Sequence, residues 1–250
     1  MQITTDGIVI KENAVGDYDR VLSVLTRDLG VIRAFSVGSR RIKSKKNAST
    51  SLLAYSRFSL SKSKDAYRVD DAAPREMFFG LRGDIVKLTV AQYLCELCSH
   101  TVPEGELSEE YLRLVLNTFH FLCDPKSDAD LLKAIAELRL MTVAGFAPDL
   151  LACRACGTYD GKRMYFDTKG SSLICADCLG TPNNSVSELD GAMLAAMRHI
   201  VYSDFEKLFS FSIPHDSAVR LSHVTEKYVI SVTERGYKTL DFLNSLLPQM

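Results

Sequence analysis

The chain has 250 residues, of which 46% are hydrophobic and 24% are charged, and its formal net charge is −1. This composition is ordinary for a soluble globular protein, and the total charge gives no indication of a nucleic-acid partner. The length allows one large domain or two to three small ones. No apolar run approaches the roughly 20 residues of a membrane helix, and the N-terminal segment 1–20 carries acidic residues where a signal peptide carries basic ones. We therefore expect a cytoplasmic protein without a membrane partner.

The segment 3–72 favours β-strands, because apolar and polar residues alternate along it and turn-forming residues interrupt the alternation. Gly16-Asp17 and 28–30 are two such turns, and in 31–37 every second residue, beginning with Val31, shares one face. Five short strands in this length fit a small Greek-key barrel such as an OB-fold. An SH3-like barrel is the alternative that the sequence leaves open.

Positive charge is concentrated in the same segment. Positions 33–68 hold ten Lys and Arg residues against one acidic residue, Asp65. The stretch 38–47 is too polar to bury, so it is either a solvated flexible loop or a surface that neutralises phosphates. Because the loops and the open face of an OB barrel suit single strands, the charge favours DNA binding. The candidates for DNA contact are Arg33, Arg40, Arg41, Lys43, Lys45, Lys46 and Arg57, to whose charge Lys62, Lys64 and Arg68 add. Nearby aromatic residues that suit base stacking and core packing equally well are Tyr55, Phe58 and Tyr67.

From residue 75 onward, the apolar residues follow helical spacing. Ser108 is expected to cap one helix, and Ser127 or Asp128 another. Cys95 and Cys98 lie within an apolar helical stripe, which favours core packing of the two thiols over a metal site. The predicted helices span 75–100, 108–123, 127–145, a stretch through 193–201 that follows a capping-box arrangement at 187–190, and 217–247 with a break at Gly236.

Four of the seven cysteines form two CxxC pairs, Cys153 with Cys156 and Cys175 with Cys178, separated by 18 residues. This spacing falls within that of zinc sites, and a hairpin between the pairs would bring them together as in a zinc ribbon. Four thiolates give a closed tetrahedral site, so we expect one structural Zn²⁺ per chain. A redox dithiol and unliganded thiols are the alternatives. The cysteine region is predicted to be an insertion, because the helices before and after it need each other to form a core.

The sequence contains no P-loop, no GxGxxG and no GxSxG motif, and its five histidines are scattered. We therefore expect a protein that is not an enzyme. Two classes of function remain: DNA binding through the basic segment, and a zinc-ribbon scaffold that binds protein partners while the basic loop is merely solvated.

Several stretches resemble the RecO family of bacterial recombination mediators. The most specific is 145–150, Gly-Phe-Ala-Pro-Asp-Leu, followed by Cys-Arg-Ala-Cys-Gly at 153–157. Individually weaker matches lie at 7–10, 19–26, 40–44 and 132–140, and the order of elements covers nearly the whole chain. The stretch 51–55, Ser-Leu-Leu-Ala-Tyr, departs from the Leu-Gln-Pro-Phe-like strand start expected there.

The resemblance implies an α+β protein with an OB-fold domain at 1–76, a helical domain at 77–150 and 183–250, and a zinc-binding insertion at 151–182. It also implies a nucleoid-associated mediator that binds single- and double-stranded DNA and anneals complementary strands. With RecR, such a mediator helps to load RecA on single strands coated by single-stranded DNA-binding protein. The acidic tail of that coating protein would dock in an apolar pocket of the helical domain, for whose rim the candidates are Lys87, Arg113, Lys133 and Arg139.

Overall fold

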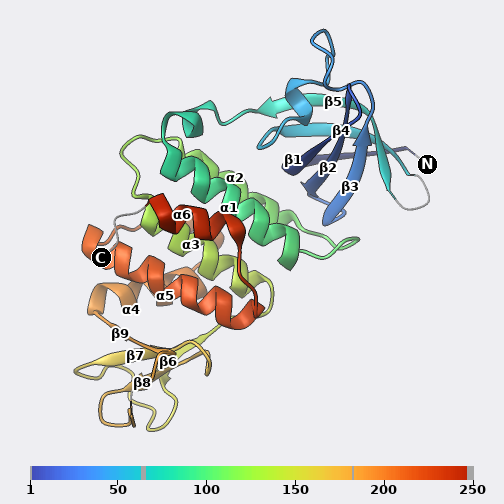
Figure 1. The fold of residues 1–250 in the computed structure, drawn as a ribbon. Helices are drawn as coiled ribbons and strands as arrows, with labels where there is room; N and C mark the ends of the chain where they lie inside the picture. Colours follow the sequence, from blue (N-terminus) through green and yellow to red (C-terminus); the bar gives the residue numbers. More distant parts are fainter. Residues whose placement is uncertain (1, 63–65, 182, 247–250) are drawn as a thin grey trace. The chain divides into compact units, whose positions relative to one another are not determined.

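The structure is a computed structural model that describes residues 2–62, 66–181 and 183–246 (Figure 1). It divides into two compact units, one formed by residues 1–125 and 237–250 and the other by residues 126–236. Lys64 of the basic segment lies outside the described residues, and so does Leu247, the predicted end of the last helix. This division does not test the domain boundaries predicted at residues 76, 150 and 182, which stay a prediction. Within the described ranges, no helix is long and apolar enough to cross a membrane.

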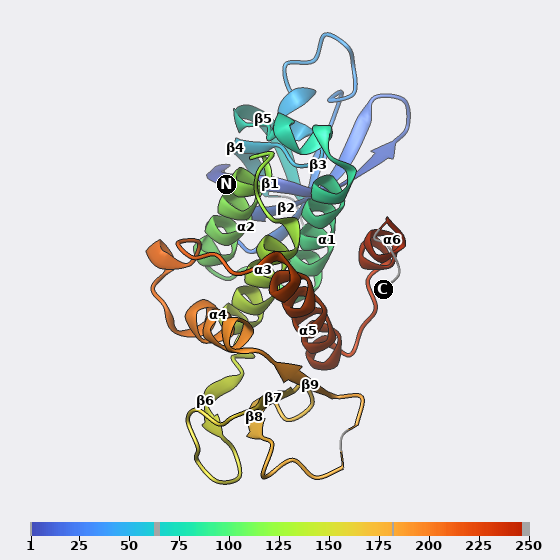
Figure 2. The same cartoon turned by 90° about the vertical axis from the view of Figure 1, so that its left-hand side faces the viewer.

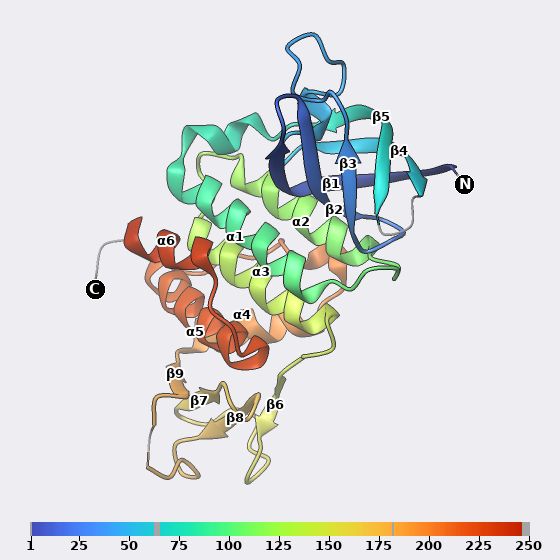
Figure 3. The same cartoon turned by 45° about the vertical axis from the view of Figure 1, so that its right-hand side comes forward.

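The first unit begins with a closed barrel of five strands, β1 (Gln2–Val15), β2 (Asp19–Thr26), β3 (Val31–Ser36), β4 (Tyr55–Lys62) and β5 (Tyr67–Glu76). The strand order around the barrel is β1-β2-β3-β5-β4, and the parallel pairing of β3 with β5 closes it. This Greek-key order is that of an OB-fold, which confirms the first of the two predicted barrels. The long loop between β3 and β4 projects from one end of the barrel (Figure 3).

Strands β3 and β4 alternate between the barrel interior and solvent, whereas β1 buries six successive residues, 5–10. In β3, Ile32 and Ala34 are buried whereas Arg33 and Phe35 are exposed. The buried set makes one apolar core, which consists of Val9, Leu22, Val24, Ile32, Ala34, Phe58, Leu60, Tyr67, Val69 and Ala72.

Three helices complete the first unit: α1 (Ile85–Thr101), α2 (Glu109–Leu122) and α6 (Lys238–Leu246). The predicted start of the first helix near residue 75 is wrong, because β5 continues to Glu76 and Asp84 caps α1 by accepting from the backbone N–H groups of Val86 and Lys87. The Ser108 side chain does not cap α2. It donates instead to the carbonyl of Thr26 at 2.6 Å, which ties the start of α2 to the barrel.

The second unit has three helices, α3 (Ala129–Val143), α4 (Gly191–Tyr202) and α5 (His215–Thr233), with α3 packed against both of the others. Asp128 caps α3, as predicted. The prediction of a capping box at 187–190 is wrong, because Val186–Leu189 is a strand. The Asp190 side chain itself caps α4 by accepting from the Met193 N–H at 2.8 Å. The predicted break near Gly236 is confirmed, because α5 ends at Thr233 and α6 begins at Lys238.

Between α3 and α4 the chain forms a four-stranded sheet from β6 (Asp149–Cys153), β7 (Met164–Asp167), β8 (Ser172–Cys175) and β9 (Val186–Leu189). Its order is β6-β8-β7-β9 (Figure 2), and the central β7–β8 pair is the hairpin predicted between the two CxxC pairs. Phe166 of β7 packs edge-on against Tyr228 of α5, with 5.3 Å between the ring centroids. The fold is therefore α+β, with an OB barrel, a helical region and a zinc-ribbon-like insertion.

Candidate nucleic-acid interface and metal centre

The basic loop, residues 37–54 between β3 and β4, is held in place by one half-buried arginine. Arg20 of β2 donates from Nη1 to the Asn47 carbonyl and to Thr50 Oγ1, both at 3.0 Å. Glu12 fixes the same guanidinium from the other side, with 3.3 Å between its Oε2 and Arg20 Nε. Within the stretch 38–47, which was predicted to be too polar to bury, Ser39 is fully buried, and Ser49 and Thr50, which follow that stretch, are fully buried too.

The tip of the loop rests on the turn between β1 and β2. Arg40 donates from its backbone N–H to the Tyr18 carbonyl at 2.9 Å and from its side chain to the Gly16 carbonyl at 3.1 Å. The Arg41 guanidinium lies over the Tyr18 ring, 5.0 Å from its centroid. These contacts hold the backbone of the loop while most of its side chains face solvent.

The loop cations are exposed and lack carboxylate partners. Arg40, Arg41, Lys43 and Lys45 are exposed, and among the described residues no carboxylate forms an ion pair with any of them. Lys46 is half-buried and donates to the Val69 carbonyl at 3.1 Å. Cations that no carboxylate neutralises attract phosphates, because pairing with phosphates releases the counterions of the polynucleotide.

The outer face of β3 carries the next predicted cation, Arg33. Its guanidinium lies 5.4 Å from the centroid of the Phe35 ring, which is 39% exposed. Phe35 is paired in register with Arg68 of β5, and Arg68 in turn makes an ion pair of 2.9 Å with Asp70. An exposed aromatic ring beside a guanidinium group is suited to stacking on a base.

Arg57 lies elsewhere on the barrel, on β4. It forms an ion pair of 3.0 Å with Asp6 of β1. This carboxylate neutralises the charge of Arg57, whereas the exposed cations of the loop have no such ion pair among the described residues. No hydrogen bond or ion pair between described residues joins the Arg57 side chain to the basic loop.

Of the aromatic residues considered for stacking, Phe58 and Tyr67 are buried in the barrel core and Tyr55 is half-buried. Burial raises the pKa of the Tyr55 hydroxyl, with the nearby Asp6 charge acting in the same direction. On the barrel, the exposed rings among the described residues are those of Tyr18 and Phe35, and sequence reasoning missed both. The Arg33-to-Phe35 spacing was the available indication, because residues two apart in a strand share a face.

Three of the four candidates for a tail-binding rim serve other roles. Lys87 and Lys133 are buried, and Lys133 makes ion pairs with Glu137 at 3.0 Å and Glu226 at 3.1 Å. Arg139 donates to carbonyls at the end of α4, including that of Ser203 at 3.2 Å. Arg113 is exposed and lines a cavity of about 190 Å³ together with Tyr55 and Arg27.

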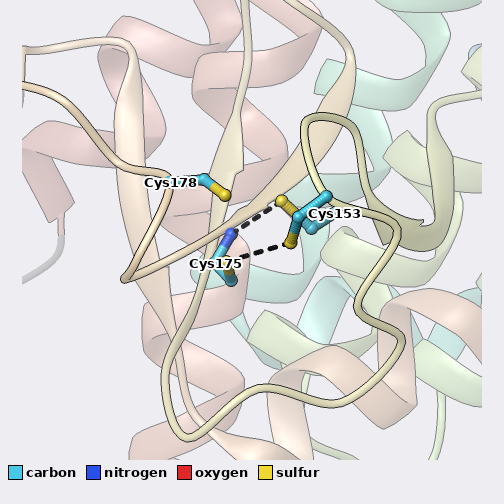
Figure 4. A group of neighbouring side chains, drawn as sticks. Cys153, Cys175 and Cys178 are labelled. Atoms are coloured by element: carbon cyan, nitrogen blue, oxygen red, sulfur yellow. Dashed lines mark hydrogen bonds between the residues drawn. The ribbon is translucent and has the colours of Figure 1, made fainter.

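The four cysteines of the insertion converge on one point. Their sulfur atoms all lie within 4.8 Å of one another, and Cys156 Sγ and Cys175 Sγ are 3.6 Å apart. Figure 4 shows Cys153 and Cys175 with Cys178 turned toward the same space. Tetrahedral zinc with bonds of about 2.3 Å requires sulfurs about 3.8 Å apart, so the cluster has the size that zinc needs.

The backbone of both CxxC turns follows the same pattern. Gly157 donates to the Cys153 carbonyl, and Leu179 donates to the Cys175 carbonyl, both at 2.9 Å. Gly157 has φ +74°, a conformation that glycine adopts without a steric penalty. Two matching turns therefore present two thiols each to a common centre.

Hydrogen bonding prepares one of these thiols for metal binding. Burial opposes ionisation of Cys153, but the backbone N–H groups of Cys175, Cys156 and Ala155 lower its pKa to about 6. The N–H of Cys175 reaches Cys153 Sγ at 3.3 Å. Donors that stabilise a thiolate favour a metal ligand, because the thiolate is the form that coordinates.

A salt bridge joins the first cysteine turn to the hairpin. Arg154 Nη1 lies 2.7 Å from Asp167 Oδ2 and also donates to Ser172 Oγ at 3.3 Å. A donor set of four cysteines in a closed cluster fits structural zinc, as the spacing predicted. By contrast, Cys95 and Cys98 are buried in α1, and burial raises the pKa of Cys98 to about 12, which confirms their place in the core.

Comparison with known proteins covers both units. The family model described as Recombination protein O N terminal matches residues 1–78, and the one described as Recombination protein O C terminal matches residues 82–241. The DNA repair protein RecO of Acetivibrio thermocellus is 32% identical over 98% of this chain and 97% of its own length. Its namesakes from Caldicellulosiruptor bescii and Alkaliphilus metalliredigens are 30% and 28% identical over 96% and 94% of this chain, and 97% and 95% of their own lengths.

Proposed function

The chain belongs to the RecO family of DNA repair proteins, and from this premise we propose that it binds single- and double-stranded DNA through its barrel and anneals complementary strands. The observation that carries the proposal is the braced basic loop. It offers exposed cations without acidic partners among the described residues, on a barrel whose fold suits single strands. The phosphate contacts come from Arg40, Arg41, Lys43 and Lys45, with Lys46 at the edge and Arg33 on the adjoining face of β3. Arg57, paired with Asp6, contributes less.

Annealing in this account needs no chemical step and no catalytic residue. Two strands repel each other through their phosphates, and cations that bind both backbones lower this repulsion. Base pairing then supplies the free energy. Tyr18 and Phe35 stack on bases of the bound strand and keep their Watson–Crick edges accessible to a second strand.

Family membership also supports a role together with other proteins of recombination. We propose that the chain acts with RecR to load RecA on single strands coated by single-stranded DNA-binding protein, in the cytoplasm and at the nucleoid. A cavity of about 370 Å³ in the first unit has the chemistry expected for the acidic, aromatic-ended tail of the coating protein. Ile10, Leu52 and Cys95 line it with apolar atoms, and Lys11 and Lys238 provide cations. Two carboxylates also line it, and both accept from backbone N–H groups: Glu12 from Leu52, and Glu96 from Lys238 and Thr239. A titration with such a tail peptide tests this, and charge reversal of Lys11 and Lys238 should abolish the binding.

Zinc in this proposal has a structural role. When bound to Cys153, Cys156, Cys175 and Cys178, it would fix the two CxxC turns on the β7–β8 hairpin. The closed set of four thiolates supports stabilisation of the insertion and not metal-assisted hydrolysis, which requires an open coordination position.

The alternative is a zinc-ribbon scaffold that contacts proteins without binding DNA. Titration of the full chain with a labelled oligonucleotide at several salt concentrations separates the two. The proposed function predicts saturable binding, little sequence preference, a linear fall of log affinity with log salt, and faster annealing of complementary strands. Absence of binding at low salt would reject it in favour of the scaffold.

A further inference from the structure

Ile42 stands at the corner of the basic loop and is the most exposed large apolar residue in the described part of the chain. Its exposed fraction is 97%. The Ser44 N–H donates to the Arg41 carbonyl at 2.9 Å, which closes a four-residue turn with Ile42 and Lys43 at its two central positions. The apolar side chain therefore projects from the loop with exposed cations before and after it.

This corner is held from both sides. Arg41 lies over the Tyr18 ring, and Gly38, where the loop leaves β3, donates its N–H to Asp19 Oδ1 at 2.7 Å. At the other end, Arg20 holds the Asn47 carbonyl. A side chain presented on a braced turn loses little conformational freedom on binding, so its apolar contact is retained as affinity.

We propose that Ile42 is a wedge that inserts between neighbouring bases of a bound DNA strand, while Arg40, Arg41 and Lys43 hold the phosphates around it. This inference rests on the proposed DNA binding. A polynucleotide matches the corner in both respects, because it presents phosphates on its outside and apolar base faces a few ångströms further in. Apolar side chains such as Ile serve as wedges of this kind in other DNA-binding proteins, where they unstack one base step.

Insertion has a consequence for annealing. A strand whose stacking is interrupted at one step exposes the Watson–Crick edges on either side of the interruption. A complementary strand can then pair at that point first. Ile42 would thus contribute to the rate of annealing beyond the electrostatic effect of its neighbours.

The test compares the full chain with its Ile42→Ser and Ile42→Leu variants on a single strand that contains 2-aminopurine, whose fluorescence rises when it is unstacked. Ile42→Ser should bind about tenfold more weakly, because several apolar carbons are no longer buried. It should also lose the fluorescence rise but keep the salt dependence, since no charge is altered. Ile42→Leu should keep both the wild-type affinity and the fluorescence rise. Leu107→Ser, which changes a residue that is 73% exposed in the connection between α1 and α2, is the matched control and should behave as the wild type.

Unchanged affinity and fluorescence in Ile42→Ser, with a wild-type chain that binds DNA, would overturn the wedge and leave the proposed function standing. A wild-type chain that binds no DNA would remove both. A third arm uses vesicles of equal parts phosphatidylglycerol and phosphatidylcholine. Binding to them that depends on Ile42, together with unchanged DNA binding, would overturn the wedge and assign the residue to a lipid surface.

Discussion

Arg20 donates to both oxygens of Asn47, from Nη1 to the carbonyl at 3.0 Å and from Nη2 to Oδ1 at 3.1 Å. One guanidinium on β2 thereby fixes the far end of a loop that leaves the barrel from β3. The basic loop is consequently an ordered surface in which the spacing of the cations is set by the barrel. In the proposed function, this order lowers the entropic cost of binding a phosphate backbone.

Replacing Arg20 with Ala should free the loop. The substitution leaves the Asn47 and Thr50 acceptors unsatisfied and should cost about 2 kcal/mol of unfolding free energy. It should also open the loop to trypsin at Lys43 and Lys45, which limited proteolysis followed by mass spectrometry can locate. Arg20→Lys should be intermediate, because the ammonium carries its donors on a single nitrogen and lacks the planar fork whose two nitrogens reach the two oxygens of Asn47. Wild-type resistance to trypsin in Arg20→Ala would contradict the bracing.

Gly30 should not tolerate a side chain. It has φ +66°, and an added Cβ would lie 1.8 Å from the Pro103 carbonyl oxygen. Gly16 is the matched control, because its φ of +55° is also positive but nothing lies within 4 Å of the position that an added Cβ would take. Gly16→Ala should cost about 1 kcal/mol for the backbone conformation alone. Gly30→Ala should cost at least about 2 kcal/mol more, measured by urea unfolding, because the Pro103 segment must move. Equal losses of unfolding free energy in Gly30→Ala and Gly16→Ala would show that the close contact between Gly30 and the Pro103 carbonyl does not stabilise the unit.

The barrel strands and the clustering of the four cysteines were predictable because their information is local. Each CxxC pair lies on one turn, and the hairpin between the pairs is continuous in sequence. Strands β6 and β9 were not predicted as strands, because each has only a few residues and pairs with a hairpin strand remote from it in sequence.

The surface proposed to bind DNA was harder to predict. Alternation showed that Arg33 and Phe35 share a face with Val31 and Val37, but a face with three apolar residues can be an interior face. Closure of the barrel instead buries Ile32, Ala34 and Ser36. The order of the loop could not be inferred either, since it depends on Arg20, which lies 27 residues from Asn47.

Loss of the metal should unfold the insertion. The double variant Cys153→Ser/Cys175→Ser removes one ligand from each CxxC turn and should abolish zinc binding, measured by plasma mass spectrometry of freshly purified, reduced protein. Its melting temperature should fall, because the free energy of binding at a structural site contributes to folding. Cys123→Ser, outside the cluster, should retain about one zinc per chain. Wild-type protein purified without zinc or any other thiophilic metal would refute this assignment.

Stability should depend on pH through His215. Its Nδ1 lies 2.8 Å from Asp128 Oδ2, and this hydrogen bond, reinforced by the charge of Asp128, raises the pKa of His215 above its ordinary value. The protonated pair therefore stabilises the fold fully below the unfolded-state pKa of about 6.5, and the contribution is lost as pH rises through the raised folded-state pKa.

Melting curves across this range should show the loss in wild-type protein and its absence in Asp128→Asn. That variant removes the charge while its side-chain oxygen can still cap α3. His223→Gln, on the same helix, should keep the wild-type profile. A wild-type profile in Asp128→Asn would show that the contact between His215 and Asp128 does not control the pH dependence.

The central claim is that the basic loop holds the phosphates of DNA, and the salt dependence of binding by the variant Arg40→Ala/Arg41→Ala/Lys43→Ala tests it most directly. Log affinity for a single strand should fall with log salt with a slope about two units flatter than that of the wild type, at roughly 0.7 per lost phosphate contact. Annealing should slow in parallel, while zinc content and melting temperature stay close to wild type. Lys162→Ala/Arg163→Ala/Lys169→Ala removes the same charge from exposed positions of the insertion and should keep the wild-type slope. A folded loop variant with the wild-type slope, or a flattened slope in the insertion variant instead, would contradict the claim.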